Sequence, residues 1–155
     1  MNEKTWLFGC ACLITGLVIG YFAMQIKEDR DITNALAVHQ FNNTAEIEDR
    51  AFQAYRHEDS PIAIYALNEA LDKLQSDEDQ GETPFMSMKI IRSDEMLTEG
   101  RLAKLYLNMG QTNSGEQHVT EALKYAQDLP AYRETVTNQA TLMQVIAAFD
   151  KSAKP

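Results

Sequence analysis

The sequence predicts an all-α protein, in which a single N-terminal transmembrane helix is followed by a domain of antiparallel helical hairpins. Three observations lead to this prediction. The stretch 6–26 is 21 residues long and contains no charged side chain. After it, no stretch alternates polar and apolar residues for long enough to indicate a β-strand. Three of the four prolines fall where helices are expected to begin or end.

The length of the apolar stretch matches a membrane. At 1.5 Å per residue, a helix of this length reaches roughly 30 Å, the thickness of a bilayer hydrocarbon core. Trp6 lies near one end of the stretch, and Tyr21 and Phe22 lie near the other. Amphipathic rings prefer these depths. We therefore expect residues 1–5 to form a short tail and residues 6–26 to span the membrane.

A cleavable secretory signal peptide is the main alternative, because it also begins with a cation and an apolar run. Its cleavage site needs small residues, and the segment 20–25 has no well-placed small-x-small pair. A lipoprotein signal ending at Cys10 also fits poorly, because Phe8 is bulky and no hydrophobic region precedes it. The sequence therefore favours an uncleaved anchor.

The charges that flank the stretch do not decide its orientation, since Lys4 precedes it and Lys27 and Arg30 follow it. A very short tail ahead of a first hydrophobic helix usually stays in the cytoplasm. We therefore expect a single-pass protein of the bacterial inner membrane, with its helical domain in the periplasm.

A stripe of small residues runs along the predicted span. Gly16 and Gly20 form a GxxxG pattern, and Cys12 extends it by one turn. Small residues four apart let another helix approach closely. Glycine is also common in membrane helices, so the pattern can arise by chance. Where the stripe is used, Cys12, Gly16 and Gly20 are expected to pack against a helix of a partner or of a second copy.

The composition limits what the remaining residues can do. About 129 residues follow the span, enough for one domain with a modest core. The net charge of −9 falls on this part, because Glu3 and Lys4 cancel. Such a surface repels nucleic acid, so we expect no nucleic-acid partner. Both cysteines lie in the span, which leaves no disulfide framework or thiolate metal site.

Capping residues predict the helix boundaries. Ser60-Pro61 and Thr83-Pro84 each place a capping residue before a first-turn proline, and Gly110 is a natural C-terminal cap. Asn43 with Glu46 is a candidate capping box.

We expect the anchor helix to continue or break near residue 30, an acidic loop at 76–82, and helices at about 32–41, 44–57, 61–75, 84–109, 114–128 and 131–150. The domains are then a connector at 27–43, a helical domain at 44–150 and a frayed tail at 151–155.

One helix pair carries a regular pattern of small and large residues. Small residues allow two antiparallel helices to cross closely, and larger ones fill the space between them. The pattern consists of Ala103, Tyr106, Gly110, Gly115, Val119 and Ala122. This spacing resembles the tetratricopeptide repeat. The chain departs from that family at Thr112, where an aromatic residue is usual, and at Gln127, where a proline is usual.

The same frame fits an earlier helix pair less well. It finds Ala51, Ala63, Leu67 and Ala70. Ala51 and Ala103 are 52 residues apart, whereas the family period is about 34, so we interpret residues 76–93 as an insertion. Helix 131–150 has apolar residues at helical spacing and is expected to cap the last pair. A generic helical-hairpin domain is the alternative.

Residues that could support catalysis are scarce. His39, His57 and His118 are far apart, and no pair has zinc-ligand spacing. No nucleophile elbow, phosphate loop or dinucleotide fingerprint is present. The acidic run 77–82 lacks the alternating ligands of a calcium loop. We expect no enzymatic activity, no cofactor and no metal.

The resemblance implies a function, since repeats of this type bind peptides or helices in the concave face formed by their first helices. The residues placed there by analogy are Phe52, Tyr55, Arg56, Leu97, Lys104, Leu107 and Asn108. The chain is thus expected to be a non-catalytic interaction module, an accessory or assembly subunit of a larger integral membrane complex. The alternative is a homo-oligomeric anchor that self-associates through its GxxxG helix.

Overall fold

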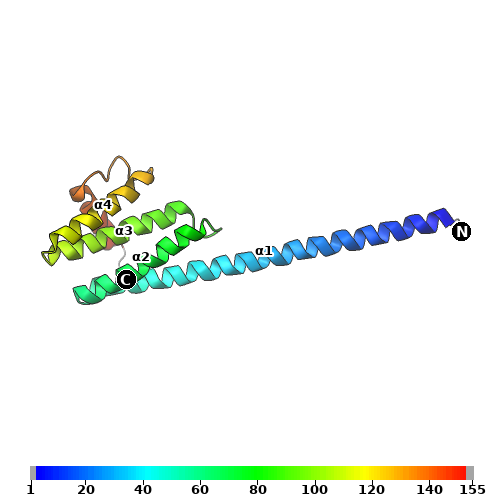
Figure 1. Ribbon diagram of the computed structural model, residues 1–155, viewed down its shortest axis with the longest axis horizontal. Helices are drawn as coiled ribbons and strands as arrows, with labels where there is room; N and C mark the ends of the chain where they lie inside the picture. The colour runs from blue at the N-terminus through cyan, green and yellow to red at the C-terminus, as the bar shows by residue number, and fades with distance from the viewer. Residues whose placement is uncertain (1–2, 153–155) are drawn as a thin grey trace. The chain divides into compact units, whose positions relative to one another are not determined.

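The computed structural model describes the backbone of residues 3–152 and the side chains of residues 24, 25, 27 and 29–152. This part of the chain is all-helical, as predicted. Its elements are α1 (Glu3–His57), α2 (Ser60–Gln80), α3 (Met88–Asn108), α4 (Thr112–Asp128) and α5 (Gln139–Ser152) (Figure 1). The chain divides into residues 1–39 and a compact unit of residues 40–155. The second unit contains the end of α1 together with α2–α5.

No helix built from the described residues is both long enough and apolar enough to cross a membrane. The predicted span, residues 6–26, and its stripe of Cys12, Gly16 and Gly20 lie outside the residues whose side chains are described, except for Met24 and Gln25 of the span. The transmembrane helix and its packing face therefore stay predictions.

The expected helix break near residues 42–43 is wrong, because α1 runs without interruption to His57. Asn43 lies inside the helix and cannot form the predicted capping box with Glu46. Thr44 is buried, and its hydroxyl donates to the carboxylate of Asp77 on α2. The residue after the expected capping position thus joins two helices.

The acidic loop at 76–82 is also wrong, because α2 continues to Gln80 and stops at Gly81, whose φ is 86°. Asp77 is fully buried within this helix. Its carboxylate accepts hydrogen bonds from Gln40 at 2.8 Å and from Lys73, in addition to Thr44. These partners keep the last turns of α2 helical, because they stabilise a charge that would otherwise need water.

Two other helices begin later than expected. Helix α3 starts at Met88, since Thr83 closes a turn by accepting the Met86 N–H at 3.1 Å. Helix α5 starts at Gln139 and not at 131, because residues 131–135 form a turn. Asn138 caps α5 by accepting the Thr141 N–H at 3.1 Å.

The small-and-large pattern correctly locates the crossing of α3 and α4. Ala103 and Ala122 are fully buried, and Gly110 turns the chain with a φ of 74°. A Cβ added at Gly115 would lie 2.6 Å from Leu107 Cγ and 3.3 Å from the Leu107 backbone nitrogen. Only glycine allows this approach between the two helices.

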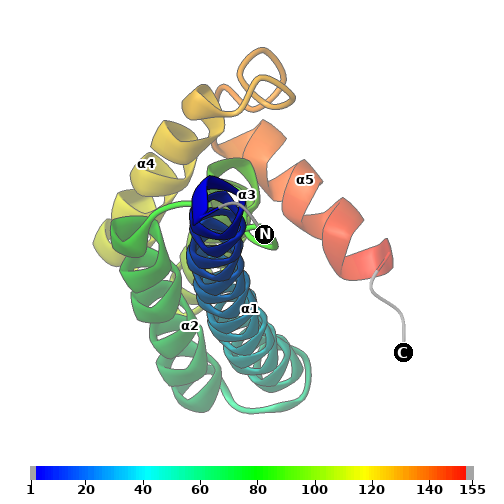
Figure 2. The ribbon, with the colours of Figure 1, turned by 90° about the vertical axis from the view of Figure 1, so that its right-hand side faces the viewer.

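The earlier pair is packed in the same way. Ala51 of α1 shares a core cluster with Leu67 and Ala70 of α2 and with Leu102 of α3. Ala63 is fully buried as well. The predicted small positions of both pairs are therefore core positions. Helix α5 contacts α3 and α4 (Figure 2), which agrees with the expected capping role.

Gly115→Leu should destabilise the domain by about 1–3 kcal/mol, because the new side chain must enter the space of Leu107 and its backbone. Gln117→Leu on the exposed face of α4 adds comparable bulk and should change stability little. Circular dichroism melting of the full chain in detergent measures both. Equal melting temperatures for the two variants would contradict close packing at Gly115.

Candidate interaction groove

A groove runs between α3 and α5. Its volume is about 320 Å³. It is lined by Lys104, Leu107 and Asn108 of α3 and by Gln139, Met143 and Ala147 of α5. Three of the seven predicted partner-binding residues therefore line one depression. The residues of α5 were not predicted to take part, since the sequence does not show which face of that helix meets α3.

The chemistry of this groove is mixed. Leu107, Met143 and Ala147 offer apolar area, while Lys104, Asn108 and Gln139 offer polar groups. In the described part of the chain, neither the Asn108 nor the Gln139 amide has a hydrogen-bond partner within the protein. Each amide can both donate and accept, so the pair can bind the backbone of a peptide segment. The groove can thus hold an apolar side chain and satisfy polar groups beside it.

The position of the groove follows from Gly100. A Cβ added there would lie 2.6 Å from Ile146 Cδ1 and 2.8 Å from Ile146 Cγ1, so α5 lies directly against α3 at this point. Leu142 and Ile146 are fully buried in the contact. One turn further along α3, Lys104 takes the corresponding place and lines the groove.

The same contact makes the prediction for Leu97 wrong. Leu97 is only 6% exposed and belongs to the core cluster that includes Met96, Leu142 and Ile146. By analogy, this face of α3 was expected to be open to a partner. Instead α5 covers it, so Leu97 stabilises the fold and cannot touch a partner.

Phe52 and Tyr55 lie half-buried where α1, α3 and α5 meet, and not in an open groove. The Tyr55 hydroxyl donates to Asp150 at 2.9 Å. The Arg101 guanidinium lies 4.5 Å from the centre of the Phe52 ring, and the Arg56 guanidinium lies 5.6 Å from it. These rings therefore hold cations of α1 and α3 in place.

We call Tyr55, Arg101, Lys104 and Asp150 the charged junction. Besides Tyr55, the Asp150 carboxylate accepts from Arg101 Nε at 3.2 Å and from Lys104 Nζ at 3.3 Å. Lys104 also donates to the Tyr55 hydroxyl at 2.7 Å. No sequence pattern indicates this role of Arg101 or Asp150, because their partners lie 46 to 95 residues away along the chain.

Two further carboxyls face Arg101. Burial and, to a lesser extent, the nearby charge of Asp94 raise the pKa of Glu48 to about 8, although Arg101 opposes this shift. Burial also raises the pKa of Asp94, to about 6, although Arg101 opposes this shift. At neutral pH, Glu48 is therefore mostly uncharged, and Arg101 interacts mainly with Asp94 and Asp150.

Glu95 is a separate buried acid on α3. Its side chain is fully buried, and neither of its carboxyl oxygens has a hydrogen-bond partner. Burial raises its pKa to about 7, the charge of Glu78 adds to the shift, and Arg92 opposes it. Arg92 itself pairs with Glu78 and Asp128. Glu95 thus carries its proton over much of the range below neutral pH.

The histidines do not form a metal site in the described residues. His118 lies 2.6 Å from a Glu99 carboxylate oxygen, and its ring stacks on Tyr106 with centroids 5.1 Å apart. Within the described range, no three His, Cys, Asp or Glu side chains are grouped so that they could hold a metal ion. His118 therefore joins α3 to α4 as a packing residue.

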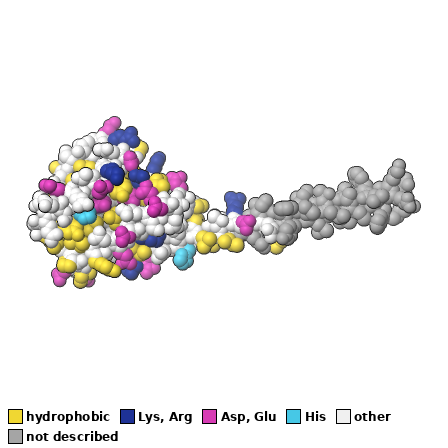
Figure 3. Space-filling view, viewed as in Figure 1, with side chains coloured by type: hydrophobic (Ala, Val, Ile, Leu, Met, Phe, Trp, Pro, Cys, Tyr) yellow, Lys and Arg dark blue, Asp and Glu magenta, His cyan; other side chains and the backbone are white. Residues whose placement is uncertain are grey.

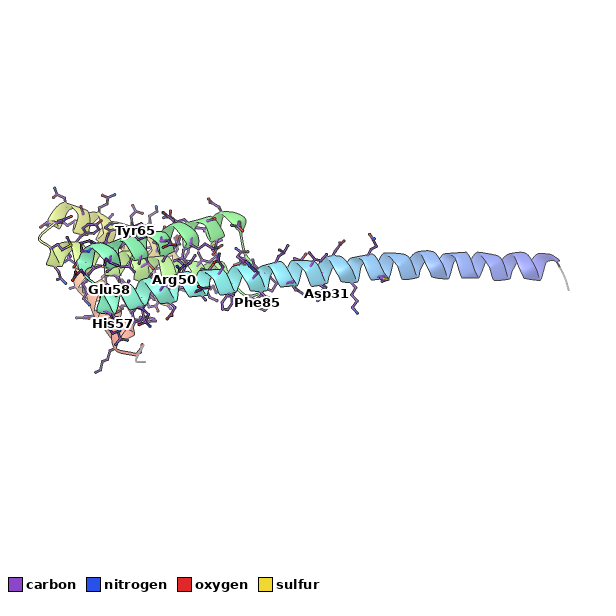
Figure 4. All side chains as sticks on the ribbon, turned by 90° about the horizontal axis from the view of Figure 1, so that it is seen from below. Asp31, Arg50, His57, Glu58, Tyr65 and Phe85 are labelled. Atoms are coloured by element: carbon purple, nitrogen blue, oxygen red, sulfur yellow. The ribbon has the colours of Figure 1, made fainter. Side chains whose placement is uncertain are left out.

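Outside the groove, the surface is mixed. On the face shown in Figure 3, acidic side chains are spread over the helices with basic ones between them. Tyr65 on α2 is 73% exposed (Figure 4). Arg50 of α1 and Glu69 of α2 form an exposed ion pair at 4.0 Å, which adds little stability.

Comparison of this chain with protein-family models, with curated proteins and with solved structures gives no match.

Glu95 should make the domain less stable as the pH rises. Its pKa is raised from 4.5 to about 7 on folding, so its stabilising contribution is complete below pH 4.5 and is lost as the pH passes 7. Glu95→Gln cannot ionise, so it should reduce the loss of stability between about pH 5 and pH 8 by on the order of 1 kcal/mol. Thermal melting at both pH values measures this.

Asp79→Asn on the exposed face of α2 serves as the control, because it removes an acid that is not buried. The control should keep the wild-type pH dependence. A Glu95→Gln variant with the same pH dependence as the control would show that Glu95 does not take up a proton on folding.

Proposed function

We propose that this chain is a non-catalytic interaction module that binds a segment of a partner protein in the groove between α3 and α5. The observation that carries the proposal is the lining of the groove, where three apolar side chains lie beside two amides without partners. Such a combination suits a peptide segment, because apolar contacts provide area and amides satisfy the peptide backbone.

The architecture of the helical unit supports this proposal. Two antiparallel helix pairs with small residues at their crossings, followed by a capping helix, agree with the tetratricopeptide-like arrangement that the sequence resembles. Such arrangements present the side chains of their first helices to a ligand, and here Lys104, Leu107 and Asn108 of α3 take that place.

We further propose that residues 6–26 hold the module at a membrane, where it serves as an accessory or assembly subunit of a larger complex. A groove of this size buries little area, so its affinity for a free peptide should be low. Confinement to the membrane raises the local concentration of a partner in the same membrane and offsets this weakness.

Self-association through Cys12, Gly16 and Gly20 is the second candidate, and it rests on the GxxxG pattern alone. The size of the purified chain in detergent separates the two proposals. A monomer that co-purifies with a larger complex from native membranes supports the accessory subunit. A dimer or higher oligomer without other proteins supports the self-associating anchor.

Ala147→Trp should abolish co-purification of the partner, because a large ring at this position fills the groove. Ala147 is exposed, so the substitution should not disturb the core. Ala148→Trp is the matched control, since Ala148 is also exposed on α5 but does not line the groove. Affinity purification from native membranes measures both variants.

The control should recover the partner at the wild-type level. Equal recovery with Ala147→Trp and Ala148→Trp would place the partner elsewhere on the chain. Circular dichroism of both variants shows whether the fold is kept.

A further inference from the structure

The charged junction has the composition of a binding site for a carboxylate. The Tyr55 hydroxyl of α1 and the Arg101 and Lys104 side chains of α3 all donate to Asp150. Arg101 also interacts with Asp94, which lies beside this site. The Arg101 side chain is only 14% exposed and that of Asp150 is 17% exposed, so water screens their interaction weakly. The Phe52 ring lies against the guanidinium and fixes its orientation.

The acidic group in this site lies in the last turn of α5, where the other side chains are exposed. Ile146 is the last buried residue of α5. Ala147, Ala148, Phe149, Lys151 and Ser152 are all exposed. Among the described residues of this last turn, Asp150 alone forms hydrogen bonds to other helices. The last turn can therefore lift while Leu142 and Ile146 keep the rest of α5 in the core.

Asp150 also leaves part of the site unused. Its distances of 3.2 Å to Arg101 and 3.3 Å to Lys104 are longer than the roughly 2.7–2.9 Å of a strong charge-assisted hydrogen bond. Lys104 has three N–H donors, of which Tyr55 and Asp150 accept two. The Lys104 side chain is 40% exposed and also lines the groove, so its third donor is accessible from there.

We propose that Tyr55, Arg101 and Lys104 form a binding site for an acidic side chain of a partner, and that Asp150 occupies this site until the partner displaces it. The proposal rests on the proposed function, since a segment in the groove reaches the site through Lys104. It specifies the partner segment as an apolar side chain placed over Leu107, Met143 and Ala147, with a carboxylate next to it. The negative charge on the rest of the domain repels an acidic segment, so such a segment binds only at this site.

A small carboxylate tests the site without any partner protein. The probe is N-acetyl-aspartate α-amide, which carries one side-chain carboxylate and fits without filling the groove. It is titrated into the full chain in detergent micelles, and the NMR signals of Arg101 Nε–H and Lys104 Nζ report binding. Asp150→Asn removes the internal competitor while keeping its size, so the probe should bind this variant at least about fivefold more tightly than wild type.

Two variants control the experiment. Asp72→Asn removes the same charge from an exposed position on α2 and should bind the probe as weakly as wild type. Arg101→Gln added to Asp150→Asn should remove the gain in affinity. If Asp150→Asn does not keep its helical spectrum, Lys104→Gln in the otherwise unchanged chain replaces it and should reduce the weak binding of wild type.

Equal affinities of wild type and Asp150→Asn, or shifts confined to residues outside the charged junction, would overturn the proposal. Where Lys104→Gln is used instead, probe binding equal to that of wild type would also overturn the proposal. These results are independent of the groove. The probe can bind at the junction even if Ala147→Trp leaves partner recovery unchanged, so failure of the proposed function and failure of this site can be told apart.

Discussion

The contact of α5 with Gly100 is the constraint on which the rest of this domain depends. Because Gly100 has no side chain, Ile146 lies directly against the backbone of α3. Leu142, one turn before Ile146 on α5, is buried beside it. This contact closes the core that α3 and α4 build. It also decides which residues remain accessible, since it buries Leu97, leaves the groove at Lys104 and brings Asp150 to Arg101.

Buried polar groups join the helices in two different ways. Asp77 receives several hydrogen bonds and ties α2 to α1 as a stable ionised group, and its pKa is lowered by its bonds to Lys73, Thr44 and Gln40 against the opposing effect of burial. Glu95 and Glu48 have raised pKa values because burial dominates. Below neutral pH, Asp77 is therefore ionised, while Glu95 and Glu48 mostly carry their protons.

The sequence allows the helical hairpins to be predicted because their packing is local. Ala103, Gly115 and Ala122 lie on adjacent helices joined by a short turn, so their spacing alone indicates a close crossing. Lys104, Leu107 and Asn108 were placed on one face of α3 by the family resemblance, and all three line the groove. Their role in binding a partner stays a prediction.

The remaining features depend on contacts that are distant in sequence. Asn43 with Glu46 suggested a helix start, because nothing nearby shows that Thr44 bonds to Asp77, 33 residues later. The acidic run around Asp77 suggested a solvated loop for the same reason. Leu97 was assigned to a partner face because the sequence does not show that α5 covers it. The position of α5 depends on the contact between Gly100 and Ile146, which are far apart in the sequence.

The most direct test of this account is a double-mutant cycle between Gly100 and Ile146, measured by chemical denaturation of the full chain. Gly100→Ala adds a Cβ that would lie 2.6 Å from Ile146 Cδ1, and Ile146→Ala removes that atom. The gain in helix propensity from alanine is present in both backgrounds and cancels in the cycle. The account predicts that the double variant is more stable than the sum of the single effects by at least about 0.5 kcal/mol. Additive effects of the two substitutions would contradict the contact between α5 and α3.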